Sequence, residues 1–156
     1  MLISAGDQVP EFTLMREDLE PFTRENLRGQ LSVLVFYPFT FSPVCTDQLQ
    51  LYERERRQLA ELGATVYAIS VDGVWPQKAF KRELGVSFEQ LSDFEPKGAV
   101  SRSFGAYIEA GGFSARALVV VGPDLTVRWS YATESIEEIP SVELLLDGVR
   151  GSIAAA

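Results

Sequence analysis

The chain has 156 residues, of which 46% are hydrophobic, 23% charged and 11% aromatic, a composition that excludes disorder and collagen-like repeats. Fourteen Lys and Arg residues against 22 Asp and Glu residues give a net charge of -8, which repels phosphate backbones and anionic membranes, so we expect neither nucleic acid nor a membrane as a partner. Residues 1–8 lack the basic start and apolar run of a signal peptide, and no apolar stretch is long enough to span a membrane, so we expect a cytoplasmic protein.

The predicted elements follow one another without an internal repeat or a low-complexity linker, so we expect one domain over residues 1–156. Spaced apolar residues over 9–14 indicate short extended pieces, and residues 24–27 a turn of helix. Residues 31–37 form a nearly continuous apolar run, which is typical of a strand buried on both faces of a sheet. Pro38 ends this strand.

A helix with one buried stripe is predicted next. From Pro43 to Gly63, apolar residues recur at spacings of three, four or seven. Arg56 falls on the same stripe, so we expect it to reach a buried carboxylate or carbonyl group. Residues 65–71 form a second apolar run, and the order strand, helix, strand predicts a parallel pair with a right-handed crossover.

The second half of the chain completes a mixed architecture. Helices are predicted over residues 76–84, 98–104 and 141–149, and a hairpin joins strands over residues 117–121 and 125–129. Within α/β folds, the order β, α, β, α, β, β, α favours a thioredoxin-like layer sandwich over a doubly wound sheet with helices between all strands. We expect a thioredoxin-like three-layer α/β/α sandwich with an N-terminal extension.

Two residue counts restrict the chemistry. The sequence holds one cysteine, Cys45, and no histidine, so no internal disulfide can form. Zinc sites of the Cys/His type, Ser-His-Asp triads and Cys-His proteases all need imidazole. We therefore expect no metal site and no cofactor. If Cys45 is a nucleophile, a permanent cation or a helix N-terminus must favour its ionised form.

The residues before Cys45 have the features of a helix start. Ser42 is a preferred N-cap residue and Pro43 suits the first helical position, so Cys45 lies in the first turn. Unpaired backbone N–H groups and the positive end of the helix dipole favour a thiolate there. The alternative is an inert core cysteine, and these local features alone leave both readings open.

Arg116 is the candidate cation. It directly precedes the apolar strand over residues 117–121. If this strand lies antiparallel to the strand over 31–37, its start is beside the other's end, and Arg116 falls near the loop that leads to Cys45. A guanidinium there would hold a thiolate and donate hydrogen bonds to an oxygen ligand. The alternative is a surface arginine at a strand end.

The pattern of Pro38, Ser42 and Cys45 resembles the peroxidatic motif of the peroxiredoxins. The resemblance covers nearly the whole chain, through residues 6–14, 33–37, 91–94, 98–101 and 103–105 and through Arg116 with its apolar strand. The sequence is most similar to the one-cysteine alkyl hydroperoxide reductase E subgroup. This resemblance implies a thiol-dependent peroxidase that reduces hydrogen peroxide, organic hydroperoxides or peroxynitrite.

The resemblance also implies a role for each residue of the motif. Cys45 would be the nucleophile, and Arg116 would stabilise its thiolate and bind the peroxide. Ser42 would orient the peroxide, and the backbone N–H groups of Val44 and Cys45 would complete the binding site. Pro38 would shield the thiolate and the sulfenic acid from bulk water.

Two glutamines mark departures from the family pattern. Gln48 stands where many relatives carry a glutamate that tethers the active-site arginines, which puts the network around Arg56 and Arg116 in question. Gln50 stands where some relatives carry a resolving cysteine. A one-cysteine mechanism follows, in which an external thiol reduces the sulfenic acid. The reductant would be a thioredoxin-like or mycoredoxin-like protein or a low-molecular-weight thiol.

Assembly and rival functions complete the sequence-based expectations. The resemblance suggests a homodimer, with Phe41, Trp75 and Phe104 either at its interface or in the core. One rival is a thiol-disulfide oxidoreductase of the thioredoxin or monothiol glutaredoxin type, which needs a cis-proline where residues 114–116 read Ser-Ala-Arg. Another rival is a non-catalytic oligomeric chaperone on the same fold, against which the intact motif argues.

Overall fold

A mixed seven-stranded sheet forms the centre of the computed structural model, which describes residues 1–154. The strand order is β2-β1-β5-β4-β3-β8-β9, and β6 and β7 form a separate ribbon. The strands are β1 (Thr13–Met15), β2 (Pro21–Thr23), β3 (Leu31–Phe36), β4 (Ala64–Ser70), β5 (Glu89–Ser92), β6 (Tyr107–Ile108), β7 (Phe113–Ser114), β8 (Ala117–Val121) and β9 (Val127–Ala132). The helices are η1 (Arg24–Leu27), α1 (Pro43–Arg54), α2 (Arg56–Glu61), α3 (Val74–Leu84), α4 (Ala99–Ser103) and α5 (Val142–Ala154).

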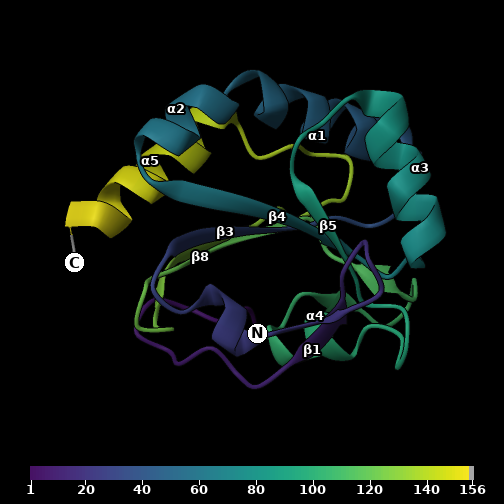
Figure 1. Ribbon diagram of the computed structural model, residues 1–156, viewed down its shortest axis with the longest axis horizontal. Helices are drawn as coiled ribbons and strands as arrows, with labels where there is room; N and C mark the ends of the chain where they lie inside the picture. The colour runs from purple at the N-terminus through teal and green to yellow at the C-terminus, as the bar shows by residue number, and fades with distance from the viewer. Residues whose placement is uncertain (155–156) are drawn as a thin grey trace.

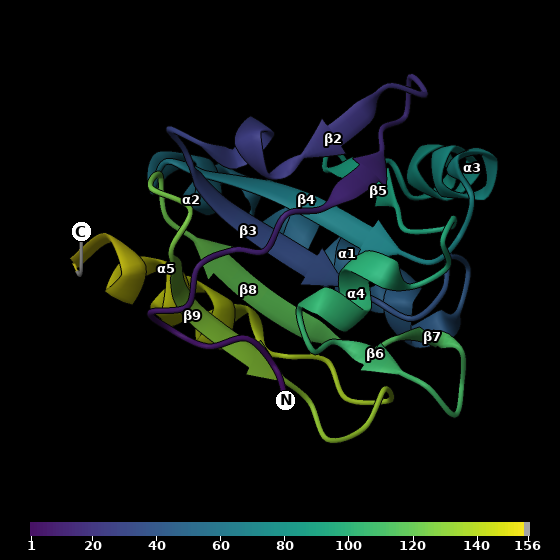
Figure 2. The same ribbon diagram turned by 90° about the horizontal axis from the view of Figure 1, so that it is seen from below.

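Helices cover both faces of the sheet. In Figure 1, α1, α2, α3 and α5 lie above the strands, and α4 lies below them. Figure 2 shows the molecule from below, where α4 lies in front of the sheet and α1 behind it. This layering is the predicted α/β/α sandwich. Within residues 1–154, no helix combines the length and the apolar character that a membrane crossing requires.

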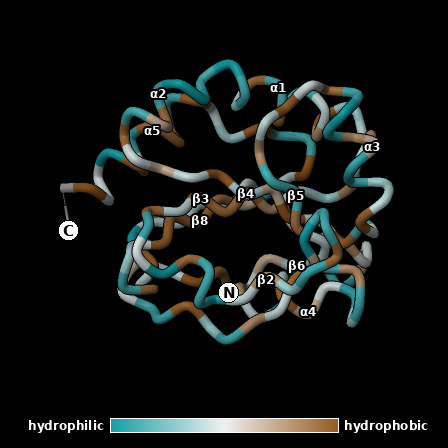
Figure 3. The backbone as a smooth tube through the Cα atoms, in the orientation of Figure 1, coloured by the Kyte–Doolittle hydropathy of each residue, from teal (hydrophilic) through white to brown (hydrophobic). Residues whose placement is uncertain are grey.

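The core has two halves, one on each face of the sheet. Every residue of β8 is buried, and so is all of β3 apart from the partly buried Leu31. Side chains alternate along β3, with Leu34 and Phe36 in one cluster and Val33 and Val35 in the other. Figure 3 shows the hydrophobic segments gathered at the central strands and the hydrophilic ones on the outer helices.

The strand register positions the two candidate reactive residues. β3 runs parallel to β4, as predicted, and antiparallel to β8. Phe36, the last residue of β3, pairs with Ala117, the first residue of β8. Arg116 therefore lies beside the segment that leaves β3 toward Cys45, which confirms the predicted antiparallel placement.

Several elements differ from the sequence-based expectation. The helix predicted from Pro43 to Gly63 is broken at Glu55, whose φ of -102° and ψ of 12° separate α1 from α2. The sequence pattern does not predict the strand β5, because the buried Gln90 interrupts its apolar residues. β9 starts two residues late, because Leu125 adopts a left-handed φ of 68° in the turn before it.

Candidate active site

The loop over residues 38–42 leads from β3 into α1. Pro38 is buried, and Ser42 occupies the N-cap position with an extended φ of -69° and ψ of 145°. The predicted helix start is confirmed. The Ser42 side chain does not cap the helix, because its Oγ donates to the carbonyl of Phe39 at 3.2 Å. The hydroxyl is therefore oriented by the loop rather than by the helix.

Cys45 lies in the first turn of α1 and is fully buried. It belongs to the core cluster that also contains Val35 and Leu49. The backbone N–H groups of Val44 and Cys45 belong to the first turn, where no preceding helical carbonyl is available to accept them. The thiol thus combines a core location with the positive end of a helix.

The guanidinium of Arg116 reaches this thiol from the start of β8. Its Nη1 lies 3.3 Å from Cys45 Sγ, and its Nε donates to the carbonyl of Ile136 at 2.8 Å. The residue is only 2% exposed, so the alternative of a surface arginine is wrong. No ion pair with a carboxylate involves Arg116 in the described part of the chain.

Gln48 accepts a second hydrogen bond from the same guanidinium nitrogen. Arg116 Nη1 donates to Gln48 Oε1 at 2.7 Å, and Gln48 Nε2 donates to the Tyr52 hydroxyl at 3.3 Å. The Tyr52 hydroxyl donates to the carbonyl of Pro140 at 2.7 Å. Burial raises the pKa of Tyr52 to about 12, so the phenol stays protonated and remains a donor at neutral pH. These bonds fix the orientation of the amide toward Arg116.

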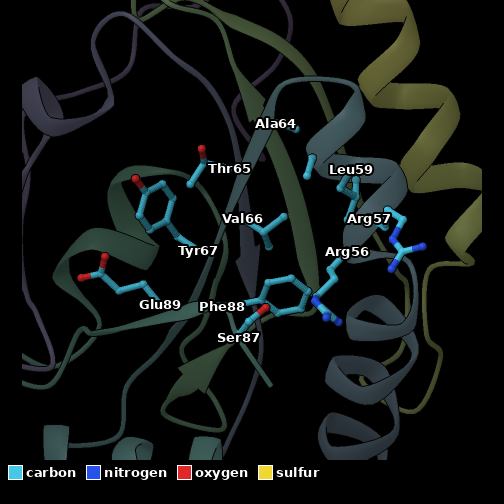
Figure 4. A pocket seen from close by; sticks show the side chains of 11 residues that line it. Arg56, Arg57, Leu59, Ala64, Thr65, Val66, Tyr67, Ser87, Phe88 and Glu89 are labelled. Atoms are coloured by element: carbon cyan, nitrogen blue, oxygen red, sulfur yellow. The ribbon is translucent and has the colours of Figure 1, made fainter. Parts of the chain in front are cut away.

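Arg56 does not take part in this network, contrary to the sequence-based expectation. Its side chain is 60% exposed and pairs with Glu53 at 3.4 Å. The break at Glu55 shifts α2 relative to the buried stripe of α1, so Arg56 faces outward. Figure 4 shows it beside Arg57 and Phe88, in a groove of about 520 Å³ whose lining does not include Cys45.

One contact of the loop was not foreseen from the sequence. The backbone N–H of Thr40 donates to Asp72 Oδ2 at 2.8 Å. Asp72 follows the last residues of β4, and the carboxyl end of a parallel strand is a common position for functional side chains in α/β folds. The position of Asp72 after a predicted parallel strand is the sequence feature that could have indicated this contact. No group of three or more Cys, Asp or Glu side chains suited to a metal ion occurs among residues 1–154.

The three candidate interface aromatics separate into two groups. Phe104 is fully buried and packs against Phe12 and Phe36, so it belongs to the core. Phe41 is 54% exposed and Trp75 is 67% exposed. Only these two are available on the surface.

The structure combines a thioredoxin-like fold with a buried cysteine at a helix start, whose sulfur contacts an arginine guanidinium. Residues 5–130 match the model of the AhpC/TSA family. The chain belongs to this family, the peroxiredoxins. It is a thiol-dependent peroxidase, and its family acts on peroxides with a thiol reductant.

Individual relatives agree with this assignment. Alkyl hydroperoxide reductase E of Mycobacterium tuberculosis is 30% identical over 130 residues, covering 83% of this chain and 85% of the relative. Alkyl hydroperoxide reductase C of Amphibacillus xylanus is 32% identical over 114 residues, covering 72% of this chain and 61% of the relative. Among solved structures, Enterococcus faecalis AhpC superposes with a TM-score of 0.89 at 25% identity, covering 99% of this chain and 95% of that chain. Peroxidoxin BcpB from Mycobacterium tuberculosis shares the fold, with a TM-score of 0.81 at 24% identity and 99% coverage of both chains.

Proposed function

We propose that Cys45 is the peroxidatic nucleophile of a one-cysteine mechanism. The Cys45 thiolate attacks one oxygen of a hydroperoxide, an S–O bond forms and the O–O bond breaks. The products are a sulfenic acid on Cys45 and an alkoxide or hydroxide, which takes up a proton. The observation that carries this proposal is the 3.3 Å contact between Cys45 Sγ and Arg116 Nη1.

The surrounding groups support the charges that develop in this step. Arg116 stabilises the attacking thiolate and the negative charge on the leaving oxygen. Ser42 and the backbone N–H groups of Val44 and Cys45 hold the peroxide at the start of α1, and the buried Pro38 excludes bulk water. Gln48 keeps the Arg116 guanidinium in the orientation that reaches sulfur, which is supported by the 2.7 Å hydrogen bond between them.

The oxidised enzyme is restored from outside the chain. With Cys45 as the only cysteine, an external thiol condenses with the sulfenic acid, which releases water and leaves a mixed disulfide. A second thiol then attacks this disulfide and regenerates Cys45. A thioredoxin-like or mycoredoxin-like protein or a low-molecular-weight thiol fits this role. Dependence on such thiols favours the reducing cytoplasm as the place of action.

We further propose a homodimer in which each protomer is a single domain over residues 1–156. Phe41 and Trp75 support this proposal, because both are exposed and Phe41 packs against Phe80 on the helix that carries Trp75. Trp75 also lines an apolar groove of about 530 Å³ together with exposed side chains of Leu19 and Phe94. Light scattering of wild type and Trp75→Lys tests this face. We expect wild type to be a dimer and Trp75→Lys to be a monomer.

Steady-state peroxide consumption with a low-molecular-weight thiol tests the enzymatic proposal. Wild type should turn over repeatedly, and Cys45→Ser should consume no peroxide above the uncatalysed rate. Thr46→Ser, which changes a neighbouring side chain by one methyl group, is the matched control. Equal consumption by wild type and Cys45→Ser would refute the role of Cys45.

A further inference from the structure

A chain of hydrogen bonds leads from the active-site guanidinium through the core to the main chain. Arg116 Nη1 donates to Gln48 Oε1 at 2.7 Å, and Gln48 Nε2 donates to the Tyr52 hydroxyl at 3.3 Å. The hydroxyl in turn donates to the Pro140 carbonyl at 2.7 Å. Gln48 and Tyr52 are fully buried, and Arg116 is 2% exposed. Loss of any bond in this chain would therefore leave a buried polar group without a partner.

The helix α1 carries the thiol, the amide and the phenol on one face. Cys45, Gln48 and Tyr52 follow one another at spacings of three and four residues, so they share the buried stripe of the helix. Gln48 lies between the other two along this stripe. Its amide oxygen thus meets the guanidinium nitrogen that also contacts Cys45 Sγ at 3.3 Å, while its amide nitrogen meets the hydroxyl one turn further along the helix.

The direction of the hydrogen-bond chain is fixed at its far end. A backbone carbonyl only accepts, so the single phenolic proton of Tyr52 is committed to Pro140. Burial raises the pKa of Tyr52 to about 12, so this proton is present at neutral pH. The hydroxyl can then only accept from Gln48, which must turn its amide nitrogen toward it. The amide oxygen is left facing Arg116, whose guanidinium has donors only.

We propose that Tyr52 is a positioning residue whose hydroxyl sets which end of the Gln48 amide faces Arg116. The correct amide orientation holds the guanidinium beside Cys45 Sγ, so this inference rests on the proposed function. Tyr52 acts through the amide and the guanidinium rather than on the peroxide. Without the hydroxyl, the amide is free to turn, and the reversed amide would set its own donors against those of Arg116.

A purely structural role for the same hydroxyl makes a different prediction. The segment between β9 and α5 contains Pro140 and also Ile136, whose carbonyl accepts from Arg116 Nε at 2.8 Å. A Tyr52 that only anchored Pro140 would influence the guanidinium through this main chain and not through Gln48. Its effect would then persist in a protein without the Gln48 amide, whereas the proposed effect would vanish there.

Three variants and a control separate the two roles. Tyr52→Phe removes the hydroxyl, Gln48→Met removes the amide, and the double variant removes both. Tyr67→Phe is the matched control, because its hydroxyl also accepts from a glutamine amide, Gln30 Nε2 at 2.9 Å, but belongs to the core cluster on the other face of the sheet. Two quantities are measured on the reduced proteins: the fraction of Cys45 present as thiolate at neutral pH, from its ultraviolet absorbance, and the rate constant of its oxidation by hydrogen peroxide.

We expect Tyr52→Phe to hold less thiolate and to react with peroxide about tenfold more slowly, which is the effect of losing one buried hydrogen bond. Gln48→Met should lose a similar factor, and the double variant should be no slower than Gln48→Met. Tyr67→Phe should match wild type. A wild-type value of either quantity in Tyr52→Phe would overturn the inference. So would an equal loss in Tyr67→Phe, or losses that multiply to about a hundredfold in the double variant.

The thiolate measurement keeps this inference separate from the peroxidase proposal. It needs no peroxide, so a wild-type protein inert toward peroxide would refute the proposed function, while the thiolate fractions of the variants would still test the role of Tyr52. Circular dichroism checks that each variant is folded. Tyr52→Met, which also lacks the hydroxyl and adapts to an apolar site, replaces Tyr52→Phe if the phenylalanine variant does not fold, with the same expected and contradicting results.

Discussion

Gln48 and Arg116 meet in the protein interior, where the amide Oε1 accepts a hydrogen bond from Nη1 at 2.7 Å. The same nitrogen lies 3.3 Å from Cys45 Sγ. An amide has no net charge, and within residues 1–154 no carboxylate pairs with this guanidinium. The buried guanidinium therefore contacts a neutral amide and the Cys45 sulfur, and in the proposed mechanism the thiolate form of Cys45 compensates its charge.

The neutral side chain of Gln48 leads to the first prediction. Gln48→Glu would place a buried carboxylate beside Arg116, where it competes with the thiolate for the guanidinium and repels the thiolate directly. We expect less thiolate at neutral pH, measured by its ultraviolet absorbance, and a rate constant with peroxide about tenfold lower. Gln50→Glu puts the same charge on α1 away from Arg116 and should leave both quantities unchanged. Unchanged absorbance in Gln48→Glu would show that the amide's neutrality is irrelevant.

Replacement of Arg116 tests whether shape or charge matters. Lysine keeps the charge but loses the planar group that contacts sulfur, Gln48 and the Ile136 carbonyl together. Stopped-flow measurement of peroxide reduction should give a rate constant at least about tenfold lower for Arg116→Lys and lower still for Arg116→Met. Denaturation should show a smaller effect, because the surrounding apolar packing is retained. A wild-type rate constant for peroxide reduction in Arg116→Met would show that Arg116 does not contribute to the reaction.

Ser42 should affect the reaction more than the fold. Its hydroxyl makes no cap bond to α1, so Ser42→Ala should change the free energy of unfolding by less than about 1 kcal/mol, below the usual effect of losing a cap. Peroxide reduction should slow clearly in Ser42→Ala and persist in Ser42→Thr, which keeps a hydroxyl. A stability loss with unchanged peroxide reactivity would instead assign Ser42 to helix capping.

The buried phenol of Tyr52 should lower the free energy of unfolding as the pH rises above 10. Burial raises the pKa of this phenol from 10.0 to about 12, so between these values the unfolded chain has lost the proton while the folded protein retains it. Stability from this group is complete below pH 10 and is lost as pH rises toward 12, by about 3 kcal/mol in all. Urea denaturation over this range should show a shallower pH dependence in Tyr52→Phe. Identical slopes in both proteins would contradict this assignment.

The parts of the site that depend on the residues next to one another in the chain could be predicted from the sequence. Ser42 and Pro43 predict where α1 begins, and the apolar runs over residues 31–37 and 117–121 predict the strand pairing that brings Arg116 near Cys45. Both inferences hold because strand burial and helix starts are encoded by neighbouring residues. The AhpC/TSA match then agreed with the motif resemblance.

Other features depend on tertiary contacts that no local pattern contains. The break at Glu55 turned Arg56 away from the core, although helical periodicity placed it on the buried stripe. The bond between Thr40 and Asp72 joins segments 32 residues apart in the sequence. Gln48 departs from the family pattern in the sequence, but its hydrogen bond to Tyr52 depends on the fold of the chain.

Mass spectrometry of the protein after one equivalent of peroxide tests the one-cysteine mechanism most directly. Without a reductant, wild type should carry a sulfenic acid on Cys45 that a dimedone-type reagent labels, and excess peroxide should convert it to the sulfinic acid. Addition of a thiol after the first oxidation should give a mixed disulfide on Cys45 and then the reduced enzyme. Absence of any adduct on Cys45, or sustained peroxide turnover by Cys45→Ser, would contradict the mechanism.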